Sequence, residues 1–140
     1  MKIGHIENGI VLDHITAGNG MNIYNVLKLG ELDCTVALIK NAESPKMGKK
    51  DIIKISTHME IDLDVLGYLD PGITVNIIHD GEVAQQRHVA LPERVVGVIK
   101  CRNPRCITSV EREIVHEFKL TDPVKKIYRC IYCEQAASRR

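Results

Sequence analysis

Two short segments decide the fold of the end of the chain: Cys101-Arg102-Asn103-Pro104-Arg105-Cys106 and Cys130-Ile131-Tyr132-Cys133. Between them lie 23 residues. Two close cysteine pairs at this separation are typical of a zinc ribbon, in which two turns each supply two thiolates to one tetrahedral ion. Disulfides and buried free thiols are the alternatives, and short paired spacings in a reducing compartment disfavour both. Four thiolates fill the coordination sphere, so we expect one structural Zn²⁺ per chain, held by Cys101, Cys106, Cys130 and Cys133.

The charge of the chain changes sign before these pairs. Residues 1–92 carry 8 Lys/Arg and 12 Asp/Glu, a net charge of −4, whereas residues 93–140 carry 11 and 6, a net charge of +5. Pro92 lies at the change, and a proline there favours an extended joint. The sequence therefore predicts two domains, 1–92 and 93–140. The second is too small to bury a large core, so metal binding should supply much of its folding free energy.

Hydrophobic periodicity in the first domain alternates between strand and helix patterns. It predicts strands at residues 3–6 and 10–14 around Asn8-Gly9, a helix over 17–29, a strand over 35–39, a polar loop over 41–50, a strand over 51–56, a helix over 61–69, and strands over 74–79 and 82–88 joined by Asp80-Gly81. The expected fold class is α+β: a ferredoxin-like antiparallel sheet with two helices on one face, followed by a small all-β domain resembling a zinc ribbon.

Composition excludes several functional classes. The 140 residues contain no apolar run near the ~20 residues that cross a bilayer, so we expect a cytoplasmic protein with no membrane partner. Trp is absent and Phe118 is the only Phe, which removes the aromatic platforms that bind single-stranded nucleic acid. Four zinc-bound thiolates would also offset part of the positive charge of the second domain, so no nucleic-acid partner is expected.

The residues that could carry chemistry are few. Asp13 and His14 are neighbours on a predicted strand and should point to opposite faces, so they form no acid/base dyad. Lys50 and Lys54 lie four residues apart on one strand face, a span of about 13 Å that suits either a nucleotide or an ordinary solvated surface. His116 is expected to be a surface residue on a strand over 114–120. Cys34, in an apolar strand, is expected to pack in the core.

Several motifs also resemble a known family. In chain order they are Gly9-Ile10-Val11-Leu12-Asp13-His14-Ile15, Met47-Gly48-Lys49-Lys50-Asp51-Ile52-Ile53-Lys54-Ile55, Thr74-Val75-Asn76, Leu91-Pro92-Glu93-Arg94 and both cysteine pairs. Together they resemble the regulatory chain of aspartate carbamoyltransferase, over nearly the whole sequence. The resemblance implies a non-catalytic subunit in pyrimidine biosynthesis. Its first domain would bind ATP and CTP, with UTP as a further ligand, and pair with a second regulatory chain, while its zinc domain would contact the catalytic chain.

The resemblance also implies a role for individual residues. The resemblance implies seven nucleotide-binding residues: Ile6, Asp13, His14, Lys50, Lys54, Asn76 and Ile78. It also implies that backbone groups near His5 and Ile6 contact the base. This chain differs from the family at two positions, because Gln86 stands where the family has a phosphate-binding lysine and Gly81 where it has an aromatic residue. Without the resemblance, a zinc-ribbon protein that binds nucleotides or nucleic acid with no enzyme partner remains an alternative, whereas an independent enzyme lacks an acid/base set.

Overall fold

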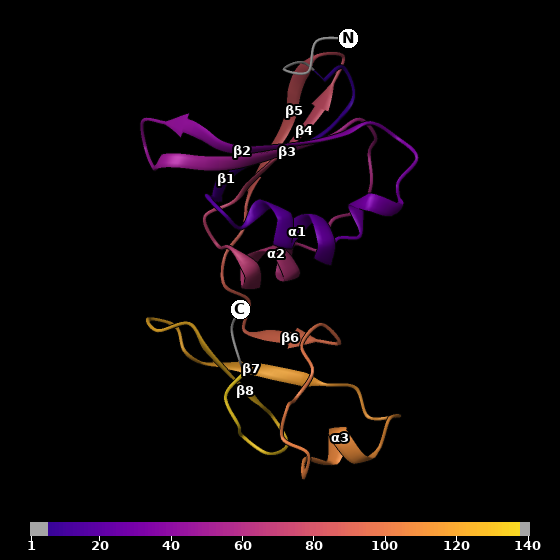
Figure 1. The fold of residues 1–140 in the computed structure, drawn as a ribbon, viewed down its shortest axis with the longest axis vertical. Helices are drawn as coiled ribbons and strands as arrows, with labels where there is room; N and C mark the ends of the chain where they lie inside the picture. Colours follow the sequence, from indigo (N-terminus) through magenta and orange to yellow (C-terminus); the bar gives the residue numbers. More distant parts are fainter. Residues whose placement is uncertain (1–5, 138–140) are drawn as a thin grey trace. The chain divides into compact units, whose positions relative to one another are not determined.

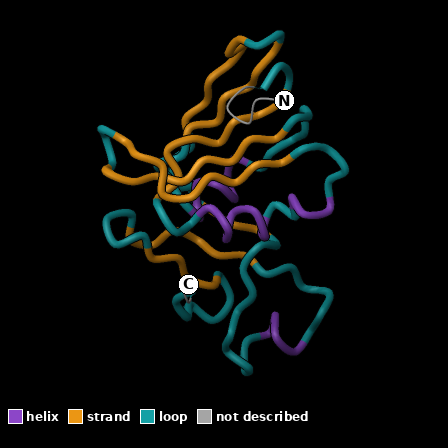
Figure 2. The backbone as a smooth tube through the Cα atoms, turned by 45° about the horizontal axis from the view of Figure 1, so that its top comes forward, coloured by secondary structure: helices purple, strands orange, loops and turns teal. Residues whose placement is uncertain are grey.

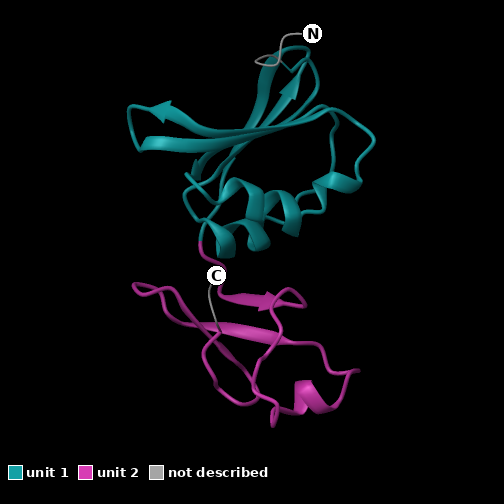
Figure 3. Ribbon diagram, in the orientation of Figure 1, with its two compact units in different colours: residues 1–90 teal, residues 91–140 magenta. Residues whose placement is uncertain are grey.

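The computed structural model describes residues 6–137. The chain divides into two compact units, residues 1–90 and 91–140 (Figure 3). The elements, in chain order, are β1 (Gly9–Thr16), α1 (Gly20–Val26), the 3₁₀ helix η1 (Leu29–Glu31), β2 (Val36–Ser44), β3 (Gly48–Ile55), α2 (Leu63–Leu69), β4 (Thr74–His79), β5 (Glu82–His88), β6 (Arg94–Val96), α3 (Ile107–Val110), β7 (Glu117–Asp122) and β8 (Ile127–Cys130). Within residues 6–137, no helix has both the length and the apolar character needed to span a membrane.

The first unit is an antiparallel five-stranded sheet in the order β2-β3-β1-β4-β5. Helices α1 and α2 lie on one face of this sheet, and among residues 6–90 no helix lies on the opposite face (Figures 1 and 2). Alternate strand residues such as Leu12, Ile53 and Val75 are buried against the helices, together with Ile23 and Leu66 from the helices themselves. Cys34 is partly buried and packs against this core, but it lies two residues before β2 and not in the predicted strand.

The first helix is shorter than its apolar pattern predicts. The pattern indicates residues 17–29, but α1 spans Gly20–Val26 and is followed by the separate 3₁₀ turn η1. Lys28 adopts a left-handed conformation (φ 56°) between the two, which ends the regular α-helical hydrogen bonding. Leu29 still reaches the core, so the hydrophobic pattern correctly identifies the buried residues but not the helix end.

The prediction of a polar loop over 41–50 is wrong. Strands β2 and β3 continue through most of this segment and leave only residues 45–47 as the turn between them. A bulge between Ile39 and Ala42, with Asn41 at φ 58°, lets the hairpin continue. The buried Asp51 carboxyl group accepts the Asn41 N–H at 2.9 Å and thereby stabilises the bulge. A polar, exposed hairpin lacks the apolar alternation on which a strand prediction depends.

The second hairpin is confirmed. Strands β4 and β5 have the predicted bounds, and the turn residues Asp80 and Gly81 both have positive φ, as an Asp-Gly hairpin turn requires. The strand predicted over 3–6 lies outside the described residues except for Ile6, which belongs to no strand. The first residue of β1, Gly9, has room for no side chain, because a Cβ atom there would lie 1.9 Å from the Ile55 carbonyl oxygen.

The second unit contains an antiparallel three-stranded sheet, β6-β7-β8, and the one-turn helix α3. Its small core consists of Val95, Phe118 and Tyr128 together with buried cysteines. The Tyr128 hydroxyl donates to the Pro92 carbonyl oxygen at 2.6 Å, which fixes the start of the unit to its sheet. The strand predicted over 114–120 begins three residues later, at Glu117.

Candidate metal centre and ligand-binding face

The four cysteines of the two pairs converge in the second unit. Their Sγ atoms all lie within 4.8 Å of one another, with 3.5 Å between Cys101 and Cys133 and 3.7 Å between Cys106 and Cys130. The first pair flanks the turn before α3, and the second pair begins at the last residue of β8. None of the four forms a disulfide.

These distances fit a tetrahedral metal ion. Zinc–thiolate bonds of about 2.3 Å place the four sulfur atoms about 3.8 Å apart, close to the separations found here. The four sulfur atoms complete the coordination sphere, so such an ion has no open position for water or substrate. The cluster therefore suits a structural metal rather than a catalytic one.

Neighbouring groups tune the thiols of this cluster. The Thr108 hydroxyl, 3.0 Å from Cys106 Sγ, lowers the pKa of that thiol to about 6, which favours the thiolate. Burial raises the pKa of Cys101 to about 12. A bound cation reverses this effect because it stabilises the thiolate form directly. Thr108 carries no sequence signal except its position two residues after a ligand cysteine.

The prediction that His116 is a surface residue on a strand is wrong. His116 precedes β7 and is partly buried, and its Nδ1 accepts the backbone N–H of Cys101 at 2.9 Å. The histidine therefore holds the first cysteine turn in place without being one of the four clustered side chains. Sequence spacing could not reveal this contact, because it joins residues 15 positions apart.

In the first unit, the sheet face opposite the helices collects most of the residues predicted to bind nucleotide. The register pairs Lys54 of β3 with Val11 of β1, Val11 with Asn76 of β4, and Asn76 with Gln86 of β5. Residues directly opposite one another in antiparallel strands share a face. Lys54, Asn76 and Gln86 therefore form one row across the sheet, and we call this surface the outer face.

One end of the outer face carries a charged network. Lys50 Nζ lies 2.9 Å from Asp13 Oδ1, and the same carboxylate accepts the His14 N–H at 2.6 Å. Burial of Asp13 disfavours its ionised form, but the hydrogen bonds from Lys50 and His14 outweigh that cost and hold its pKa below the usual value. The His14 Nδ1 atom lies 3.2 Å from the Thr74 hydroxyl, which sequence analysis did not identify.

The expectation that Asp13 and His14 point to opposite faces is wrong. The ladder between β1 and β3 shifts between Leu12 and Ile15, and His14 adopts φ 59° within this bulge. The bulge lets the His14 ring reach Thr74, which lies directly opposite Asp13 in the ladder with β4. The side chains of Asp13 and His14 therefore lie at the same end of the outer face.

The remaining predicted residues are placed as follows. Ile78 pairs with Gly9 and is buried at the far end of the outer face, and Ile6 is partly buried just before β1. The Gln86 amide donates to Asn76 Oδ1 at 2.9 Å, so the glutamine joins the polar row. Arg87 pairs with Val75, whose side chain is in the core, and so it points to the helix-bearing side, as strand alternation predicts.

The fold and the cysteine cluster together define a two-unit chain with a polar sheet face in one unit and a structural metal site in the other. In comparisons with known protein families, each unit matches a domain of the same regulatory chain. Residues 1–90 match the family "Aspartate carbamoyltransferase regulatory chain, allosteric domain", and residues 93–140 match the metal binding domain of the same regulatory chain.

Curated relatives carry the same description. The aspartate carbamoyltransferase regulatory chain of Clostridium acetobutylicum is 56% identical over 135 residues, covering 96% of this chain and 92% of the relative. Those of Clostridium botulinum and Bifidobacterium longum are 51% and 42% identical, covering 99% and 98% of this chain and 94% and 99% of the relative. The chain belongs to the aspartate carbamoyltransferase regulatory chain family. It is therefore a regulatory and not a catalytic subunit, and its partners are catalytic chains.

Proposed function

We propose that the outer face of the first domain, residues 1–92, binds the nucleotides CTP and ATP, with UTP as a further ligand. The observation that carries this proposal is the placement of Lys50 and Lys54 on one strand and one face, beside the Asp13 network and the row that contains Asn76. Two ammonium groups at this spacing suit the phosphates and the sugar of one nucleotide.

Each part of the outer face suits a different part of the ligand. Asp13 holds one donor of the Lys50 ammonium, which has further donors for phosphate oxygens. Lys54 and Asn76 offer polar groups for ribose and base, and the apolar Ile78 suits a base plane. The backbone near Ile6 has the amide and carbonyl groups that distinguish amino from keto groups on a base. Gln86 supplies no charge, so we expect weaker triphosphate binding than a lysine there would give.

For the second domain, residues 93–140, we propose one structural zinc ion on Cys101, Cys106, Cys130 and Cys133 and a surface that contacts the catalytic chain. Four sulfur ligands favour zinc among the common divalent ions. Thr108 and His116 support the ligands through Cys106 and the backbone of Cys101. Without the metal, the small core of this domain should not stay folded.

The two domains together would regulate the catalytic chains, because nucleotide binding to the first domain would be coupled to the state of those chains. Nucleotide bound to the first domain would bias the catalytic chains through the zinc domain, with a coupling free energy of about 1–3 kcal/mol, which is a several-fold effect. We further propose a homodimer of regulatory chains and a cytoplasmic location, consistent with free thiols at the metal site. The strand order β5-β4-β1-β3-β2 and the two helices on one face support a ferredoxin-like class for the first domain.

Calorimetric titration of CTP and ATP into the zinc-loaded chain tests the nucleotide site. Lys54→Ala should weaken binding by about 1.5–3 kcal/mol because a charge-assisted contact is lost. Lys125→Ala, which removes an exposed lysine from the other domain, is the matched control and should bind as the wild type does. Gln86→Lys should tighten triphosphate binding more than monophosphate binding. Equal affinities for wild type and Lys54→Ala would overturn the proposed site.

Metal analysis tests the second domain. The purified chain should hold one zinc ion, and Cys130→Ser should lose both the ion and the folded second domain. Cys34→Ser changes the cysteine that lies outside the cluster and should retain a full equivalent of zinc. Full zinc content in Cys130→Ser would contradict the ligand assignment.

A further inference from the structure

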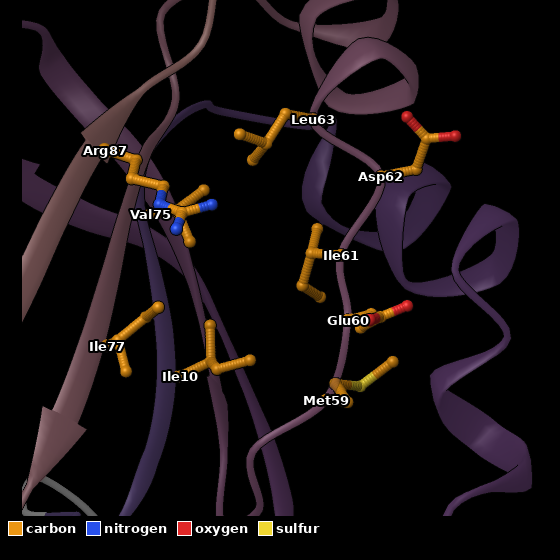
Figure 4. A pocket seen from close by; sticks show the side chains of 9 residues that line it. All are labelled: Ile10, Met59, Glu60, Ile61, Asp62, Leu63, Val75, Ile77 and Arg87. Atoms are coloured by element: carbon orange, nitrogen blue, oxygen red, sulfur yellow. The ribbon is translucent and has the colours of Figure 1, made fainter.

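Arg87 has no place in the proposed nucleotide site, because it points to the side of the sheet that carries the helices. On that side the sheet and the segment before α2 enclose a groove of about 690 Å³ (Figure 4). The size is within the range of small-molecule sites. The groove is lined by Ile10, Met59, Glu60, Ile61, Asp62, Leu63, Val75, Ile77 and Arg87.

The side chains that face one another across the groove are apolar, and three charged residues, Glu60, Asp62 and Arg87, complete its lining. Ile10, Val75 and Ile77 come from the sheet, and Ile61 and Leu63 face them from the segment opposite (Figure 4). Successive side chains of this extended segment alternate in direction, so its two acidic side chains lie on the side opposite Ile61 and Leu63. Glu60 and Asp62 point away from the sheet (Figure 4), and both are exposed. Asp62 is engaged as the N-cap of α2, where it accepts the N–H groups of Asp64 and Val65.

Arg87 is the one cation of the groove lining. Its guanidinium contacts the side-chain amide of Gln85, and within residues 6–137 no carboxylate lies within ion-pair distance of it. A guanidinium keeps its charge at all physiological pH values and presents a fork that matches a carboxylate. Apolar side chains that face one another, with one such cation beside them and both acidic side chains turned away, are complementary to a molecule with an apolar body and one carboxylate.

We propose that this groove binds a small apolar carboxylic acid of the medium-chain fatty acid class. The alkyl chain lies between the isoleucines of β1 and β4 and the segment with Ile61, and the carboxylate pairs with Arg87. Because Val75 and Asn76 are neighbours on β4, this ligand and a nucleotide would contact opposite faces of the same strand. The inference goes beyond the proposed nucleotide function and does not depend on it.

The test is titration of octanoate into the full, zinc-loaded chain, followed by two-dimensional NMR of backbone amides and Ile methyl groups. Octanoate should shift the signals of Ile10, Ile61 and Ile77. Arg87→Gln should weaken binding tenfold or more, as loss of a charge-assisted pair predicts. Arg112→Gln, at an exposed arginine of the second unit, is the matched control and should not change the affinity. Ile77→Asp should abolish binding, since it places a carboxylate in the apolar wall.

Several results would overturn the proposal: no binding of octanoate, equal binding by Arg87→Gln, or binding of uncharged 1-octanol as tight as that of octanoate. A groove covered by a second copy of the chain would make octanoate change the sedimentation coefficient, and that result would also contradict it. CTP titration of Arg87→Gln is measured in parallel. Unchanged CTP affinity in this variant separates a failure of the groove from a failure of the nucleotide site.

Discussion

Asp51 is a fully buried carboxyl group that accepts three backbone N–H groups from two segments of the first unit. Its Oδ2 accepts the N–H groups of Gly18 at 3.1 Å and Gly20 at 2.9 Å, and its Oδ1 accepts that of Asn41 at 2.9 Å. Asp51→Ala leaves three donors without this acceptor. An unsatisfied buried donor costs about 1–3 kcal/mol, so with partial relaxation we expect a loss of about 3–5 kcal/mol in the free energy of unfolding of this unit.

Native-state hydrogen exchange, measured by NMR on the full zinc-loaded chain, reports this loss locally. The slowest amides of β1 and β3 should exchange faster in Asp51→Ala by two or more orders of magnitude, because about 1.4 kcal/mol corresponds to tenfold. Asp51→Asn retains one accepting oxygen and should give a smaller effect. Asp33→Ala, at an exposed aspartate, should change nothing. Protection in Asp51→Ala equal to that of the wild type would show that Asp51 does not stabilise this unit.

Three further predictions concern other contacts. Gly9→Ala should destabilise the first unit by about 2–4 kcal/mol, because the new Cβ would lie 1.9 Å from the Ile55 carbonyl oxygen; chemical denaturation without such a loss would contradict this. The lowered pKa of Asp13 means that the contacts of its carboxylate stabilise the fold at pH values above the unfolded pKa of about 3.9, and that this stabilisation is lost as the pH falls through the folded pKa. Carboxyl NMR titration should show a higher Asp13 pKa in Lys50→Met than in the wild type. No rise would refute the pairing of Asp13 with Lys50. Tyr128→Phe removes a buried hydrogen bond of 2.6 Å and should cost the second unit about 1–2 kcal/mol in thermal unfolding, whereas an unchanged midpoint would show that the bond contributes nothing.

Local sequence signals predicted the parts of the fold that depend on local chemistry. Asp80-Gly81 marks a turn that needs positive φ, and the two cysteine pairs need only their spacing to indicate a common site. Both features are found where the sequence places them. The second helix, predicted over 61–69, begins two residues later, at Leu63, because Asp62 caps its start.

The features that the sequence did not predict depend on contacts between distant residues. The hairpin over 41–50 has a polar sequence, and it is supported by a carboxyl group that lies ten residues from Asn41. His14 shares a face with Asp13 only because β1 is bulged, and a bulge is set by pairing with another strand. His116 supports the metal site through a backbone hydrogen bond, a type of contact that leaves no residue pattern.

We propose that nucleotide on the outer face of the first domain regulates a catalytic partner through the zinc domain. The most direct measurement is the activity of the complex with its catalytic chains at subsaturating aspartate, with and without CTP, for the wild type and Lys54→Ala. We expect a several-fold change in activity with nucleotide in the wild type, matching a coupling free energy of about 1–3 kcal/mol, and little change in Lys54→Ala at the same CTP concentration. An unchanged activity in the wild type, or an equal response in both complexes, would contradict it.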